Sequence, residues 1–302
     1  MEYDEGYQNE QAHSEAFKRH LEAVSGIVGR CLGRQGIVEI GCGKGYFLEL
    51  LSANGFDIRG FDPAYEGSNP LIQKSTFQPT RALAAEGLVL RHVLEHVRNP
   101  YEFLDMIRAA NDGRGRIYIE VPCFDWILEH HAWFDIFYEH VNYFRLSDFF
   151  RLFGRVDASG HLFGGQYLYV VAELSSLRSP RIEPASPVEL PRGFLSSLGS
   201  MRSSGAVEKR PVCVWGGASK GVIFSLLRER MGNPVDMVVD VNPMKQGRYL
   251  AGTGLKVFSP KEALSLLPDE AAIYIMNSNY TAEIREMSGN RYHYIEIDHA
   301  EL

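Results

Sequence analysis

A glycine-rich turn after a short apolar segment constrains the fold of this chain more than any other feature. Residues 36–40 are mostly apolar and lead into Gly41-Cys42-Gly43-Lys44-Gly45, after which residues 46–53 take up helical spacing. Glycines at alternate positions let a backbone approach a ligand closely, and the N-terminus of the following helix offers N–H groups to an anion. The order predicts a strand, a ligand-binding turn and a helix.

The remainder of the first half alternates between strand-like and helical segments. The expected strands are residues 57–61, 87–90, 117–121 and 166–174, and the expected helices include residues 11–32 and 100–110. Strands that alternate with helices favour a mainly parallel sheet with crossover helices on both faces. The fold class is therefore α/β and Rossmann-like, and residues 166–174, rich in Tyr and Val, are expected to close the sheet.

A change of composition divides the chain. At 302 residues it has about twice the usual domain length, and residues 175–208 are rich in Pro, Ser and charged residues, as in a linker. Beyond it, expected strands at 212–215, 235–241, 272–276 and 292–297 indicate a second, smaller α/β domain. The predicted parts are residues 1–174, a linker at 175–208 and residues 209–302.

Charge and cysteine usage exclude several classes of function. The chain has 31 Lys and Arg against 38 Asp and Glu, a net charge of -7, and it lacks a basic stripe for a phosphate backbone, so no nucleic-acid partner is expected. It also lacks an apolar run long enough for a bilayer, so we expect no membrane association and a cytoplasmic location. Its four cysteines lie far apart, which favours reduced thiols and no metal site.

The details of the glycine turn indicate which class of ligand it binds. A dinucleotide fingerprint requires a third glycine at the position of Tyr46. The spacing present, with Glu39 ahead of it, instead resembles motif I of the class I methyltransferases that use S-adenosylmethionine. This resemblance implies that S-adenosylmethionine is the cofactor and that residues 1–174 bind it. The implied cofactor-binding residues are Glu39, Gly41, Gly43, Gly45, Asp62 on the ribose and His92 near the methyl group, whereas Glu95 and His96 are expected to cap and pack a helix.

Residues 133–144 combine aromatic rings with titratable groups. They include Tyr138, Glu139, His140, Asn142 and Tyr143. A histidine is well suited to remove a proton near neutral pH, and an adjacent carboxylate can hold its tautomer. The pattern favours an acceptor site with His140 as the base, and packed aromatics alone would also explain it.

A narrower resemblance covers most of the chain. Glu-His-x-x-Tyr-Phe after Glu-Val-Pro, together with the runs at 214–221, 240–249 and 276–280, is similar to the sugar C-methyltransferases, which act on keto-deoxysugars linked to a nucleoside diphosphate. The resemblance implies that His140 is the general base, and that Tyr143, Tyr138 and Asn142 are candidate donors to an enolate. In the second domain, the glycine turn at Gly216 could bring a helix N-terminus against a phosphate of the acceptor, aided by Lys220, Lys245 or Arg248. A glycine turn that only closes a βα unit would also explain this pattern.

The chain departs from that family at two points. Phe137 stands where the family has a tyrosine, and no counterpart of the family's N-terminal zinc module is expected. Two other functions remain open, an O- or N-methyltransferase for another small metabolite and a noncatalytic nucleotide-binding protein. A monomer or a homodimer is expected.

Overall fold

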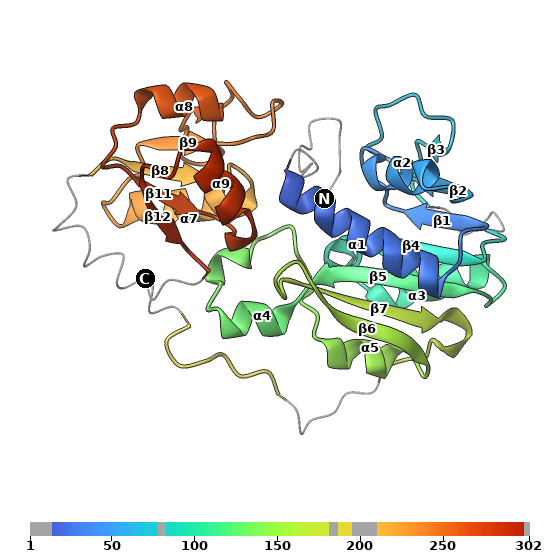
Figure 1. Ribbon diagram of the computed structural model, residues 1–302. Coiled ribbons are helices and arrows are strands. Elements are labelled where there is room, and N and C mark those ends of the chain that lie inside the picture. Colours follow the sequence, from blue (N-terminus) through green and yellow to red (C-terminus); the bar gives the residue numbers. More distant parts are fainter. Residues whose placement is uncertain (1–13, 78–82, 181–186, 195–209, 299–302) are drawn as a thin grey trace. The chain divides into compact units, whose positions relative to one another are not determined.

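The computed structural model describes residues 14–77, 83–180, 187–194 and 210–298, and it forms two compact units (Figure 1). The first unit holds most of residues 19–125 and 138–188, and the second holds residues 126–137 and 189–298 together with the start of the first helix. Parts of the expected linker, 181–186 and 195–208, and residues 11–13 of the expected first helix lie outside the described residues. The domain boundaries stay a prediction, and the grouping of residues 126–137 with the second unit is not apparent from the sequence.

A seven-stranded sheet forms the first unit, in the order β3-β2-β1-β4-β5-β7-β6. Its strands are β1 (Ile37–Ile40), β2 (Ile58–Phe61), β3 (Ile72–Gln73), β4 (Gly87–Arg91), β5 (Arg116–Pro122), β6 (Val156–Leu162) and β7 (Tyr167–Glu173). The pairs among β1 to β5 are parallel, and β7 runs antiparallel to β5 and β6. The mainly parallel α/β fold predicted from the sequence is thereby confirmed.

The helices of this part of the chain begin where the sequence supplies local signals. They are α1 (Glu15–Cys31), α2 (Tyr46–Ala53), α3 (Pro100–Ala110), α4 (Phe124–Glu129) and α5 (Leu146–Leu152), with short 3-10 turns η1 (Leu94–His96), η2 (Trp133–Asp135) and η3 (Leu174–Ser176). Asn99 caps α3, because its side chain accepts a hydrogen bond from the N–H of Glu102 at 3.3 Å and Pro100 is preorganised for the first helical position. In Figure 1, α1 runs along the sheet that contains β4 and β5.

A five-stranded parallel sheet forms the second unit, in the order β10-β9-β8-β11-β12. The strands are β8 (Val212–Trp215), β9 (Met237–Val239), β10 (Val257–Phe258), β11 (Ala272–Ile275) and β12 (His293–Glu296), and the helices are α7 (Ser219–Arg230), α8 (Pro260–Leu266) and α9 (Thr281–Met287), with η5 (Ser278–Tyr280). Cys213, Ile273 and Ile275 are fully buried in its core. This unit is also a doubly wound α/β arrangement in its strand order.

None of the helices in the described residues combines the length and the apolar character that a bilayer span requires. The cytoplasmic location stays a prediction.

Candidate cofactor and acceptor site

The sheet order of the first unit determines where a ligand can bind. Strands β1 and β4 are neighbours, with Glu39 paired to Val89, and from this pair the chain winds outward in opposite directions to β3 and to β5. Ligands of open α/β sheets bind at the carboxyl ends of the strands at such a switch point. The glycine turn follows β1, and His92 follows β4, so both meet at this edge.

The glycine turn has the backbone conformation expected from its spacing. Gly43 and Gly45 have φ angles of 56° and 87°, in the left-handed region that side chains with a Cβ disfavour. A Cβ on Gly45 would come within 2.3 Å of Ile72 Cδ1, whereas a Cβ on Gly43 would meet nothing within 4 Å. Gly45 is therefore favoured mainly by its left-handed φ, and a side chain there would also displace the end of Ile72, whereas Gly43 faces open space.

Asp62 stands at the tip of β2 and is bound to the same turn. Its Oδ2 accepts a hydrogen bond from the N–H of Gly43 at 2.7 Å, and its Oδ1 accepts one from the N–H of Ala64 at 2.7 Å. The carboxylate thus lies beside the glycine turn, as the resemblance requires of the residue that binds the ribose. Its contact with the ribose stays a prediction.

Glu39 is a buried carboxyl at the end of β1. It is 2% exposed, and its Oε2 has no hydrogen-bond partner among the described residues. Burial raises the pKa of Glu39 to about 7, against the opposing effect of the Arg91 charge. A buried carboxylate without a full set of partners is costly, so the site is suited to a cationic group such as the methionine end of S-adenosylmethionine.

Glu120, on β5, is the centre of a buried charge network that the sequence analysis missed. Its Oε1 lies 3.0 Å from His20 Nε2 and 3.1 Å from Arg91, and its Oε2 accepts a hydrogen bond from the Tyr118 hydroxyl at 2.6 Å. Burial alone would raise its pKa, but the Arg91 charge and the histidine hydrogen bonds hold the pKa of Glu120 well below its usual range. A carboxylate inside the apolar run 117–121 was the available signal.

His92 connects this network to the turn after β4. Its φ of 53° is in the left-handed region, a costly conformation for a non-glycine residue that often marks a functional site. Its ring nitrogens lie 3.3 Å from Glu95 Oε1 and 3.1 Å from Glu120 Oε1. Burial opposes the charged form, but these hydrogen bonds raise the pKa of His92 to about 9, so the ring is cationic near neutral pH.

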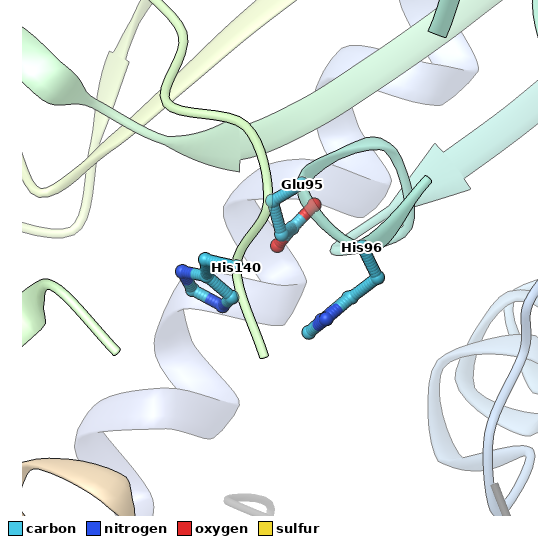
Figure 2. Close-up of side chains that lie close together, drawn as sticks. All are labelled: Glu95, His96 and His140. Atoms are coloured by element: carbon cyan, nitrogen blue, oxygen red, sulfur yellow. The ribbon is translucent and has the colours of Figure 1, made fainter. Parts of the chain in front are cut away.

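Glu95, His96 and His140 form a cluster at the end of β4 (Figure 2). One ligand-type atom from each lies within 4.8 Å of the others, and Figure 2 shows the three side chains pointing toward a common centre. Both residues belong to the 3-10 turn η1, where Glu95 is buried, and one atom of each lies near His140. Their expected role in capping and packing a helix stays a prediction.

The other predicted acceptor residues take different places. The Tyr138 side chain is 81% exposed, and a hydrogen bond to the Glu139 carboxylate accompanies a raised pKa of its hydroxyl, mainly through the charge of Glu139. The Asn142 amide donates to the carbonyls of Leu94 and Val97, so it joins its own segment to η1. The Tyr143 ring lies 6.2 Å from the His140 ring, centroid to centroid.

The predicted acceptor residues of the second unit also have partners. Lys220 Nζ lies 2.8 Å from the buried Asp135 carboxylate, and Lys245 Nζ lies 3.5 Å from Asp240. Asp240 in turn accepts from the N–H of Gly217 at 2.8 Å, next to Gly216, and Arg248 is exposed. Contacts of these residues with an acceptor stay predictions.

Comparison with known proteins agrees with this geometry. Residues 9–159 match the family described as methyltransferase domain, and residues 193–293 match the one described as C-methyltransferase C-terminal domain. The chain belongs to the class I S-adenosylmethionine-dependent methyltransferases that carry this C-terminal domain. It is an enzyme, and its cofactor is S-adenosylmethionine.

The individual proteins that resemble this chain have low sequence identity to it. The C-methyltransferase NovU of Streptomyces niveus is 24% identical over 308 residues, which cover 87% of this chain and 73% of the relative. A solved Pyrococcus horikoshii protein has a TM-score of 0.44 at 13% identity, covering 60% of this chain and 100% of its own. A Thermotoga maritima protein, described as an S-adenosylmethionine-dependent methyltransferase and possible histamine N-methyltransferase, has a TM-score of 0.41 at 17% identity, covering 53% and 90%.

Proposed function

We propose that this enzyme methylates a carbon next to the ketone of a nucleoside-diphosphate-linked keto-deoxysugar, with His140 as the general base. The observation that carries the proposal is the approach of His140 to Glu95 in the unit that also holds the glycine turn. The match of residues 193–293 to a C-methyltransferase C-terminal domain supports carbon as the methylated atom. The similarity to a relative named as a C-methyltransferase supports it further.

The proposed proton transfer uses the residues of the cluster. His140 takes the proton from the carbon next to the ketone, and the Glu95 carboxylate stabilises the imidazolium that forms. Tyr143, with Tyr138 and Asn142 as further candidates, donates a hydrogen bond where the enolate oxygen charge develops. Bound S-adenosylmethionine supplies a methyl group that is electrophilic because it is attached to a sulfonium. The enolate carbon forms the new C–C bond, the S–CH3 electron pair stays on sulfur, and His140 later releases its proton to water.

Binding of the acceptor is assigned to residues of the second unit. The exposed Arg248 and the Gly216 backbone remain candidates for the phosphates. Lys220 and Lys245 would have to leave Asp135 and Asp240, or share them, to contact a phosphate. Glu139 holds Tyr138 through its carboxylate, so its proposed role is to position that hydroxyl.

Hydrogen exchange tests the proposed base separately from methyl transfer. In deuterated water without methyl donor, the wild-type enzyme is expected to exchange the hydrogen next to the ketone of a thymidine-diphosphate keto-deoxysugar. His140→Ala is expected to abolish this exchange while S-adenosylmethionine still binds, and His161→Ala, an exposed histidine on β6, is the matched control. Hydrogen exchange that persists in His140→Ala would refute the assignment of His140 as the general base. Methyl transfer without any exchange in the wild type would favour an oxygen or nitrogen acceptor.

A further inference from the structure

The cluster of Glu95, His96 and His140 has a composition that the proposed proton transfer does not require. A base needs one imidazole, yet here two imidazoles and a carboxylate meet. Two histidines and one carboxylate are a donor set that zinc-class divalent ions take in proteins. We propose that these three side chains form a binding site for a divalent transition-metal ion of the zinc class.

Glu95 supplies the first argument. Its side chain is 1% exposed, and its Oε2 has no hydrogen-bond partner among the described residues. The carboxylate group lies close to the two imidazoles (Figure 2). Its other oxygen, Oε1, is held by His92 at 3.3 Å. A buried carboxylate oxygen is expensive without a partner, and a cation among the three side chains would satisfy it.

The tautomer of His96 supplies the second argument. Its Nδ1 lies 2.9 Å from the carbonyl oxygen of Glu139, and a carbonyl can only accept, so Nδ1 carries the proton. The lone pair is then at Nε2, which is the ring nitrogen that can coordinate a metal in this tautomer. Metal-binding histidines usually donate their second ring nitrogen to such a carbonyl, which fixes the tautomer and the orientation of the ring.

The backbone around the cluster is organised in advance. The N–H groups of Val141 and Asn142 both donate to the carbonyl of Glu95, at 2.8 Å and 3.1 Å. The Asn142 amide adds contacts to Leu94 and Val97. Hydrogen bonds thus hold η1, which carries Glu95 and His96, next to the segment that carries His140. Ligand atoms around a tetrahedral zinc ion lie about 3.3 Å apart, and here they lie within 4.8 Å of one another, so side-chain rotations that bring them up to about 1.5 Å closer would complete the site.

The consequence for activity rests on the proposed function. An imidazole whose lone pair binds an ion cannot accept a proton, so zinc and the acceptor proton compete for His140. Bound zinc is then an inhibitor of hydrogen exchange and of methyl transfer. A chelator is expected to restore both activities.

The test measures binding without using activity. The full-length chain, freed of any histidine tag and of metal, is titrated with Zn²⁺ against a chromophoric chelator. We expect one tight site per chain, weakened at least about tenfold in each of Glu95→Gln, His96→Ala and His140→Ala. It should be unchanged in the exposed control His161→Ala. Far-UV circular dichroism without metal identifies any variant that is misfolded.

Each outcome has a separate meaning. Equal zinc binding by the wild type and by folded His96→Ala and His140→Ala would overturn the metal site, as would the absence of tight binding. If zinc binds to the wild type and the variants weaken its binding, but His140→Ala still exchanges the substrate hydrogen at the full rate, the metal site stands and the base is another residue. If zinc does not bind but His140→Ala abolishes exchange, the proposed function stands alone.

Discussion

Glu39 shows how burial changes the chemistry of one side chain at the cofactor site. It is the next-to-last residue of a fully buried strand, and loss of hydration raises its pKa to about 7. Arg91 limits the rise but does not cancel it. The carboxyl therefore changes its charge near neutral pH, and its attraction to a cationic ligand changes with it.

This titration predicts a pH-dependent affinity for S-adenosylmethionine. A carboxyl with a pKa near 7 is about one-tenth ionised at pH 6 and about nine-tenths at pH 8. The attraction is lost as the pH falls through 7, so the dissociation constant is expected to fall several-fold between pH 6 and pH 8. Calorimetric titrations at pH 6, 7 and 8 would measure the change.

Glu39→Gln is the matched variant for this prediction. It keeps the shape of the side chain and removes the charge, so its affinity should be weaker at pH 8 and should lack the Glu39-dependent increase. Methylthioadenosine lacks the cationic methionine end and should bind the wild type with little pH dependence. The same pH profile in Glu39→Gln and in the wild type would assign the titration to another group.

Three elements, α1, β4 and β5, meet at Glu120. They contribute His20, Arg91 and Tyr118 respectively, the last from the same strand as Glu120. All lie within or beside an apolar sheet, so each charge depends on its partners for compensation. The network therefore fixes how the helix and the two strands pack beneath His92.

Removal of the central carboxylate predicts a large loss of stability. Glu120→Gln leaves the Arg91 guanidinium buried without the carboxylate that pairs with it at 3.1 Å, at a cost of about 3–5 kcal/mol. In calorimetry, the midpoint temperature of thermal unfolding of the first unit is expected to fall by roughly 10 °C.

Arg155→Gln is the control at a surface site. Arg155 forms ion pairs with Asp157 and Glu173, but water surrounds it and contributes most of its solvation. The unfolding temperature of Arg155→Gln should therefore stay close to that of the wild type. A comparable loss in both variants would show that burial is not the cause of the effect at Glu120.

Each of the two units contains one of the sheets, and residues 126–137 group with the second unit. Phe134 is 1% exposed, and its neighbour Asp135 pairs with Lys220 on α7. Lys220 Nζ also lies 5.8 Å from the Phe134 ring centre. A segment from the first half of the sequence thus completes the packing around α7.

Phe134→Ala is expected to loosen the second unit selectively. Deletion of a buried phenylalanine costs about 3–5 kcal/mol, so amides in α7 should exchange with solvent roughly a hundredfold faster or more. Amides in α3, which packs in the first unit, serve as the internal reference in the same mass-spectrometric experiment. Equal acceleration in α3 and α7 would contradict separate cores.

Local sequence signals predict much of the fold. The helices at 46–53 and 100–110 and the strand at 212–215 have the predicted bounds, because apolar periodicity and the caps lie in the segments themselves. Strands β3, β6 and β10 and the short helices α4 and α5 were not predicted. The shortest of these, β3 and β10, have two residues each, too few for a periodic pattern, and exist because neighbouring strands pair with them.

The sequence alone determined the class of enzyme and its cofactor turn, because the glycines, Glu39 and Asp62 act through backbone conformation and strand ends that neighbouring residues set. Only the tertiary structure decided which charged groups meet. Glu120 contacts His20 across 100 positions, and Glu95 approaches His140 from another segment. Burial and proximity in three dimensions control the charge of these groups, and neither can be read from spacing along the chain.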